Sequence, residues 1–283
     1  MQDMSYFENI ASLSEEVNGD EGVVQKFEIT KDSSDVEVLD FIVLYICTHI
    51  QQHFALKGGY ALSKLLEFPR ATKDVDFSIE IQEDYDKFKN VLVDIGEILI
   101  DKGFITSYEV KDTISATMSG GIKYKRDGVE VLGVDIGLHQ LRSGVGKVDI
   151  GFAETNMFKP ERMLADKISA ILSYKRFRRV KDVYDVYCIT NTFYLDYKLL
   201  KELTDLRMEG QEDNWNNIPF NDEVIVQYEH AWNKLNLVEM ITDEPMRKPA
   251  FDEVIARFYK LTRPLKYNDI VKSWSSTHGR WLE

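Results

Sequence analysis

The sequence has few of the side chains that form crosslinks or metal centres. Its 283 residues include two cysteines, Cys47 and Cys188, and five histidines. Both cysteines lie in apolar stretches, where a thiol packs as a small hydrophobic side chain. Because the two cysteines lie far apart and form no C-x-x-C pair, the sequence shows no zinc-finger spacing. Buried thiols are consistent with the reducing cytoplasm, which is the location that we expect.

Long apolar runs are also absent. The longest, Phe41 to Cys47, is far too short to cross a membrane. The segment Met1–Ser14 contains neither the basic part nor the apolar part of a secretory signal peptide. We therefore expect a protein that has no membrane partner and remains in the cytoplasm.

Positive charge is scarce as well. The 35 lysine and arginine residues face 48 aspartate and glutamate residues, which gives a net charge of −13. A protein that binds nucleic acid with its whole surface is usually basic. Any contact with nucleic acid must therefore be local, and the densest basic run, at 175–179, is the candidate. Its arginines are Arg176, Arg178 and Arg179.

The 44% of apolar residues is ordinary for a globular protein and is enough for a sizeable core. Apolar residues at helical spacing predict helices over 35–53, 60–67, 84–102, 160–175, 178–191, 197–208, 221–236 and 249–261. Alternating patterns with turn signals predict strands over 54–56, 75–79, 113–118, 122–125, 129–138 and 148–152.

This order of elements predicts an α+β fold in which the pattern changes near residue 158. We expect a polar N-terminal extension over 1–32, a mixed β-sheet core flanked by helices over 33–158, and a mostly helical C-terminal half over 159–283.

The strongest local signal combines two glycines with two aspartates. Gly58 and Gly59 follow a short apolar strand and precede a helix. Glycine lets backbone N–H groups approach a ligand, and a helix N-terminus favours an anion such as a triphosphate. Asp74 and Asp76 begin the next strand, where alternate side chains share one face with roughly 6–7 Å between their α-carbons. Such a pair suits Mg²⁺ bound to substrate phosphates, and the alternative is a solvated turn.

Asp135 interrupts the apolar strand predicted over 129–138. Its neighbours Val134 and Ile136 point to one side of the strand and Asp135 to the other. A carboxylate in a central strand is costly unless it is paired or bound to a metal. Asp135 is therefore a candidate third metal ligand, and the alternative is a solvated aspartate on an edge strand.

Two helical segments carry further candidates. Lys167 lies at the edge of the apolar stripe of the helix over 160–175, where it either contacts a triphosphate in a cleft or extends to water. Asp182 and Asp185 are three residues apart and share a helix face. The basic run before them either contacts phosphate or an RNA backbone, or is a solvated helix start.

Taken in order, these motifs resemble the AbiEii/AbiGii-type toxins. The motifs are G-G-x-A-L at 58–62, R-x-T-x-D-x-D-F at 70–77, the strand aspartate at 135, A-x-K-x-x-A-I at 165–171 and K-D-x-Y-D at 181–185. The resemblance implies a polymerase-β-like nucleotidyltransferase of a type IV toxin–antitoxin, or abortive-infection, system. The segment 33–158 would then be the catalytic core and 159–283 a helical C-terminal domain.

The resemblance also implies roles for individual residues. Asp74, Asp76 and Asp135 would bind Mg²⁺, in a site for two ions, and Asp135 would help to activate the acceptor hydroxyl. Nucleotide-binding roles would fall to Gly58, Gly59, Ser63, Arg70, Lys167 and Asp182, while Lys167 and Asp185 would complete the catalytic set. The substrate would be an NTP, the acceptor an RNA with tRNA favoured, and a cognate antitoxin a further partner.

One position departs from the pattern of many relatives. Tyr60 stands where a serine or threonine often follows the second glycine, and a phenol beside the nucleotide would weaken or redirect its binding. Ser63, one turn further on, is the candidate substitute. Two alternatives therefore stay open: transfer to a small molecule of the aminoglycoside type, which an acidic surface suits, and a degenerate nucleotidyltransferase that only binds a partner.

Overall fold

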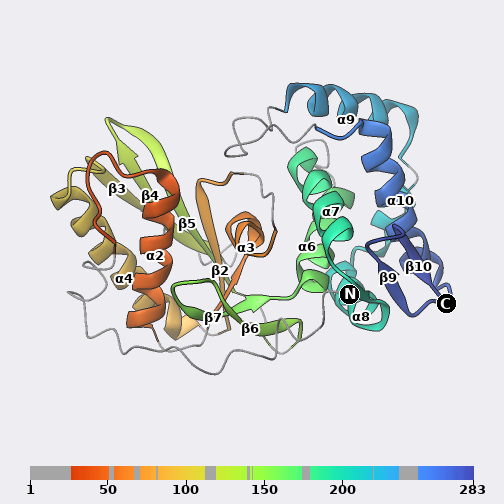
Figure 1. Ribbon diagram of the computed structural model, residues 1–283, viewed down its shortest axis with the longest axis horizontal. Coiled ribbons are helices and arrows are strands. Elements are labelled where there is room, and N and C mark those ends of the chain that lie inside the picture. The colour runs from red at the N-terminus through yellow and green to blue at the C-terminus, as the bar shows by residue number, and fades with distance from the viewer. Residues whose placement is uncertain are drawn as a thin grey trace. The chain divides into compact units, whose positions relative to one another are not determined.

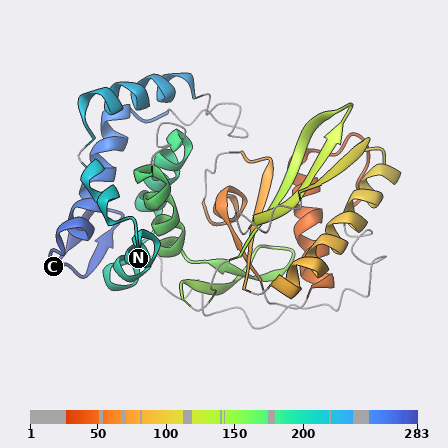
Figure 2. The ribbon, with the colours of Figure 1, turned by 180° about the vertical axis from the view of Figure 1, so that it is seen from behind.

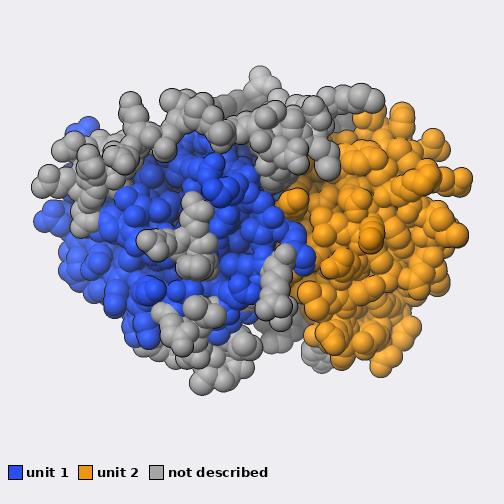
Figure 3. Space-filling view, turned by 90° about the horizontal axis from the view of Figure 1, so that it is seen from below, with its two compact units in different colours: residues 1–65, 71–158 blue, residues 66–70, 159–283 orange. Residues whose placement is uncertain are grey.

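The computed structural model describes residues 27–50, 54–66, 71–80, 82–111, 119–138, 141, 143–173, 179–218, 220–235 and 248–283. The chain divides into two compact units (Figures 1 and 3). Unit 1 comprises Met1–Leu65 and Ala71–Phe158, and unit 2 comprises Leu66–Arg70 and Lys159–Glu283. Within these described ranges, none of the helices combines the length and the apolar character needed to cross a membrane.

In its described part, unit 1 contains a seven-stranded mixed sheet with the order β3-β4-β5-β2-β1-β7-β6 (Figures 1 and 2). Its strands are β1 (Phe54–Lys57), β2 (Asp74–Ile79), β3 (Ser107–Lys111), β4 (Ser119–Arg126), β5 (Val129–Leu138), β6 (Val145–Asp149) and β7 (Glu154–Phe158). β2 runs parallel to β5 and β1 runs parallel to β7, whereas the other neighbours are antiparallel.

The helices of unit 1 are α2 (Asp35–His49), α3 (Gly58–Leu65) and α4 (Gln82–Asp101). α2 begins at a capping box, in which Ser34 accepts from the backbone N–H of Glu37 and the Glu37 carboxylate accepts from the N–H of Ser34 at 2.7 Å. α2 and α4 pack against each other and against the central strands.

An aromatic cluster joins α4 to the sheet. The rings of Phe54 in β1, Phe77 in β2 and Phe88 in α4 lie 5.4–5.6 Å apart between centroids. The hydroxyl of Tyr124 in β4 donates to the carbonyl of Leu92 in α4 at 3.0 Å. Because strand side chains alternate, the residues on either side of Phe77 point to the opposite face of the sheet.

Unit 2 contains the helices α6 (Pro160–Leu172), α7 (Val180–Thr192), α8 (Tyr197–Met208), α9 (Asp222–Lys234) and α10 (Phe251–Tyr267), with the 3₁₀ helix η3 (Glu212–Asn217). A small antiparallel sheet has the order β10-β9-β8, formed by β8 (Leu195–Asp196), β9 (Ser273–Ser275) and β10 (Arg280–Leu282). The indole of fully buried Trp274 in β9 donates to the carbonyl of Thr190 in α7 at 2.7 Å. This bond ties the small sheet to the helices.

The structure confirms the predicted α+β class, and it corrects several predicted elements. The strand predicted over 148–152 is shifted, because β6 covers Val145–Asp149 and the chain turns at Gly151, whose φ is +90°, before β7. α10 continues through Pro264 to Tyr267, beyond the end predicted at 261. The strand predicted over 113–118 lies outside the described residues.

Other differences concern elements and side chains that local patterns did not reveal. The sequence reading missed the strands β3, β7, β8, β9 and β10. The last three have only two or three residues and therefore carry almost no periodic signal. Cys47 and Cys188, which we expected to be buried, are half-buried and form no disulfide. Burial nevertheless raises the pKa of the Cys47 thiol to about 11.

The aromatic cluster should dominate the stability of unit 1. Phe88→Ala removes a fully buried ring and should lower the free energy of unfolding by about 3–5 kcal/mol, because a cavity remains under β1 and β2. Urea unfolding followed by circular dichroism measures this loss. Ile100→Ala in the same helix removes a side chain that is 37% exposed, and should cost about 1 kcal/mol or less. Equal losses in both variants would contradict the central role of the cluster.

Candidate functional site

The two glycines lie at the turn from β1 into α3. Gly58 has a φ of +73°, in the left-handed region that favours glycine. A Cβ at this position would collide with the carboxylate of Asp76, so the backbone of the turn lies directly against that side chain. The N-terminus of α3 and the Asp76 carboxylate therefore form one local arrangement.

The pairing of β2 with β5 aligns the aspartates. Asp76 lies in register with Asp135 on β5 and with Lys57 on β1, and Asp74 lies in register with Gly133. Cross-strand partners share a face, as do residues two positions apart on one strand. All three carboxylates consequently lie on the sheet face opposite to Phe77 and the aromatic cluster.

The third carboxylate has a cation as its partner. The ammonium of Lys111 in β3 lies 3.0 Å from Oδ1 of Asp135, and both side chains are partly exposed, at 32% and 49%. Lys111 pairs in register with Gly121, and Gly121 pairs with Asp135. Since glycine has no side chain, the lysine crosses β4 without obstruction.

The carboxyl group of Asp74 has a raised pKa. Its side chain is exposed at the start of β2, yet partial burial of the carboxyl group raises its pKa above the ordinary value for aspartate. The nearby negative charges of Asp135 and Glu130 raise the pKa further, whereas Lys111 and Lys123 lower it. A carboxylate that is disfavoured in its charged form gains most when a cation binds beside it.

The oxygen donors on this face fit a hard divalent cation, since carboxylates are the ligands that Mg²⁺ and Mn²⁺ prefer. Across the described ranges, however, no group of three or more histidine, cysteine, aspartate or glutamate side chains is arranged to hold a metal ion. Asp135 is directed toward Lys111 instead. Recruiting it as a ligand would require this ion pair to open.

Lys167 of α6 forms a second constellation with two aspartates of α7. Its ammonium donates to Asp182 at 3.0 Å and to Asp185 at 2.6 Å. Lys167 and Asp185 are 8% and 3% exposed, so the lysine does not extend to water. Arg179 adds a longer contact to Asp182 at 3.6 Å. The spacing of the two aspartates thus places both carboxylates on the helix face that meets α6.

Tyr60 lies inside unit 1. Its side chain is 1% exposed, and its hydroxyl donates to Asp40 of α2 at 2.6 Å. Lys64 completes the group with a 2.6 Å ion pair to the same carboxylate. The phenol is therefore a core side chain that fixes α3 against α2, and the proposed interference with a nucleotide loses its geometric basis.

The remaining predicted residues are accounted for individually. The hydroxyl of Ser63 donates to the carbonyl of Tyr60 at 2.7 Å, so its proton is used within α3. Arg70, Arg176 and Arg178 lie outside the described residues. Lys111 is the residue that the sequence reading missed, although the alternation of polar and apolar residues over 107–111 could have revealed the strand that carries it.

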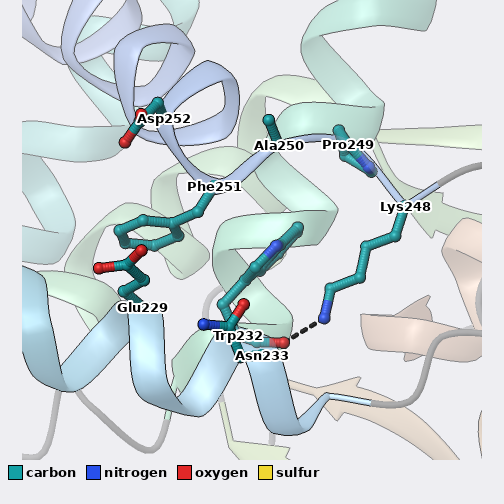
Figure 4. Close-up of a pocket in the computed structure, with 8 residues that line it drawn as sticks. All are labelled: Glu229, Trp232, Asn233, Lys248, Pro249, Ala250, Phe251 and Asp252. Carbon is teal, nitrogen blue, oxygen red and sulfur yellow. Dashed lines mark hydrogen bonds between the residues drawn. The ribbon is translucent and has the colours of Figure 1, made fainter.

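Unit 2 also contains a hollow of about 370 Å³ between α9 and α10 (Figure 4). Trp232 and Phe251 contribute its apolar wall, and none of the predicted site residues lines it. Lys248 donates to the carbonyl groups of Trp232 and, at 2.9 Å, Leu235 (Figure 4 shows its approach to α9). These bonds satisfy carbonyls at the end of α9, which gives the lysine a structural role.

Unit 1 thus combines a mixed sheet, a glycine turn and aspartates on two parallel strands. Residues 43–269 match the family described as nucleotidyl transferase AbiEii toxin, type IV TA system, and the chain belongs to this family. The resemblance inferred from the motifs is thereby confirmed, and the chain is a nucleotidyltransferase of a toxin family.

Solved structures include chains that are similar to this one. JHP933 from Helicobacter pylori has a TM-score of 0.50 and 15% identity, over 91% of this chain and 94% of that chain. MenT4, a nucleotidyltransferase toxin from Mycobacterium tuberculosis H37Rv, has a TM-score of 0.48 and 17% identity, over 88% of this chain and 89% of its own. No curated protein matches the chain.

Removing the cation from the α6–α7 constellation should destabilise unit 2. Lys167→Met leaves two carboxylates without their shared partner and should lower the free energy of unfolding by about 3–5 kcal/mol. Urea unfolding measures the loss, and Lys201→Met, which breaks an exposed pair with Asp205, should cost about 1 kcal/mol or less. Adding Asp185→Asn to Lys167→Met should recover part of the loss. No recovery would contradict an electrostatic origin.

The raised pKa of Asp74 predicts a pH-dependent gain in stability for Asp74→Asn. A carboxyl group whose pKa is higher in the folded state opposes folding as pH rises through its folded pKa. The asparagine variant should therefore be the more stable at pH 7, and the difference should vanish below the unfolded pKa of about 3.9. Thermal unfolding from pH 3 to pH 8 tests this. Asp94→Asn on the exposed side of α4 is the control, and a pH-independent gain would contradict the prediction.

Proposed function

We propose that this nucleotidyltransferase moves a nucleotide from an NTP to a hydroxyl group of an RNA, with tRNA the favoured acceptor and Mg²⁺ required. The observation that carries the proposal is the register of β2 and β5, which aligns Asp76, beside the Gly58 turn, with Asp135 and keeps Asp74 on the same face. This arrangement supplies oxygen ligands next to a helix N-terminus, where a triphosphate is favoured.

The residues of unit 1 would have different roles in the reaction. Asp74 and Asp76, joined by Asp135, would hold Mg²⁺, which supplies positive charge against the phosphates and the leaving pyrophosphate. The backbone of Gly58 and Gly59 would receive the triphosphate. Asp135 would accept the proton of the acceptor hydroxyl, whose oxygen forms a bond to the α-phosphorus. The bond from the α-phosphorus to the bridging oxygen breaks, and pyrophosphate leaves.

For unit 2 we propose that Lys167, Asp182 and Asp185 contact the nucleotide, as the family resemblance implies. Their mutual bonds hold all three side chains in fixed positions. The group thus combines one ammonium with two carboxylate acceptors, which suits a role in orienting polar atoms of a nucleotide.

The charge of the protein limits how an RNA would bind. With a net charge of −13, the surface as a whole repels a polyanion, so the contact would be confined to a basic patch. Arg179, which is 51% exposed at the start of α7, belongs to the basic run that we propose for this contact. A type IV system also implies an antitoxin as partner, and a cytoplasmic location would give access to NTP and tRNA.

The same acidity favours a second candidate acceptor. A polycationic small molecule of the aminoglycoside type would be attracted by the surface that repels RNA. The two acceptors share the transfer chemistry on Asp74, Asp76 and Asp135. They are distinguished by whether label appears on RNA or on the added small molecule.

The test incubates the protein with Mg²⁺, total cellular RNA and, in separate reactions, each of the four α-labelled NTPs. One NTP should label a discrete RNA band of tRNA size. Asp76→Ala should reduce labelling by at least about 100-fold because a metal ligand is lost, while its circular dichroism stays unchanged. Full activity in that variant would overturn the assignment. Label on an aminoglycoside alone would favour the second candidate. If no acceptor is labelled and calorimetry with Mg²⁺ detects no NTP binding, the chain is a degenerate member that acts by binding.

A further inference from the structure

The backbone of Lys111 is fixed by a contact with α4. Its carbonyl accepts a hydrogen bond from the hydroxyl of Tyr85 in α4 at 2.9 Å, and Tyr85 is 4% exposed. Gly120 leaves room for that phenol, because a Cβ there would collide with it. The backbone at the end of β3 is therefore held against α4, while the lysine side chain points to the other face.

On that face a row of charges crosses the sheet. In register order the charged residues are Lys57, Asp76, Asp135 and Lys111, and the uncharged Gly121 lies between the last two. The other lysines of β3 and β4 have glutamate partners on the same sheet: Lys123 pairs with Glu130, and Lys125 pairs with Glu109. Among these three lysines, Lys111 is the one whose partner is a proposed metal ligand.

The ion pair between Lys111 and Asp135 can open so that each side chain binds another partner. Both side chains are partly exposed, so water can replace either partner at little energetic cost. A lysine ammonium is a compact charge on a flexible stem, which can move by several ångströms without any change in the backbone. The lysine also lies on the face that carries Asp74 and Asp76, where the triphosphate is expected.

We propose that Lys111 is a further nucleotide-binding residue, which neutralises Asp135 in the absence of ligand and moves to the phosphates of the NTP when a divalent cation takes Asp135. The inference rests on the proposed function. It assigns two opposite effects to one side chain: the lysine competes with the metal for Asp135, and it attracts the metal-bound triphosphate.

The test measures these two opposite effects, on metal binding and on nucleotide binding, in the same variants. Lys111→Met removes the charge and keeps an unbranched side chain, and Lys125→Met makes the same change on the same face. Binding of Mn²⁺ alone is titrated by electron paramagnetic resonance. Binding of the α,β-methylene analogues of the four NTPs is then measured by calorimetry at saturating Mg²⁺. Circular dichroism confirms that each variant is folded, and Lys111→Arg restores the charge.

Lys111→Met should bind Mn²⁺ about three- to tenfold more tightly than the unsubstituted protein and the preferred analogue about three- to tenfold more weakly. Lys125→Met should change both constants by less than about twofold, and Lys111→Arg should recover analogue binding. Tighter Mn²⁺ binding without weaker analogue binding would overturn the inference, as would equal effects of Lys111→Met and Lys125→Met. If the unsubstituted protein binds neither Mn²⁺ nor any analogue, the proposed function itself fails.

Discussion

The parallel pairing of β2 with β5 is the constraint on which the candidate site depends. It aligns Phe77 with Ile136 on the face that α4 covers, and Asp76 with Asp135 on the opposite face. Because side chains alternate along a strand, a slip of one residue would bring Asp135 to the apolar side and expose Ile136. The hydrophobic core therefore enforces the register, and the register in turn assembles the carboxylates. Stability and chemistry are coupled through the same strands.

Carboxylates that lie close together repel one another, and in each unit a lysine offsets this repulsion by forming ion pairs. In unit 2, Lys167 is buried between Asp182 and Asp185, where breaking the group would leave uncompensated charge out of water. In unit 1, the pair of Lys111 and Asp135 is open to solvent. The first arrangement is rigid, whereas the second can exchange partners. This difference in burial suits a fixed scaffold in one unit and a ligand-responsive contact in the other.

The departure at position 60 illustrates how burial changes the meaning of a residue. A tyrosine beside the two glycines suggested a phenol in the nucleotide site. The structure turns its ring into unit 1, where the hydroxyl bonds to Asp40, and burial together with that carboxylate raises the pKa of Tyr60 far above its ordinary value. The phenol therefore stays protonated and acts as a donor within the core. A degenerate enzyme is no longer favoured by this position.

The sequence by itself determined the elements with strong periodicity and the order of the motifs. It placed β5 and α8 at their observed bounds, located the turn of Gly58 and Gly59, and led to the family, because these features depend on local spacing. Only the tertiary structure decided which side chains meet. The partner of Asp135 is Lys111, from a strand that was not predicted, and the partners of Lys167 are on another helix. Such contacts arise from strand register and helix packing between segments that are distant in sequence, and no local pattern encodes them.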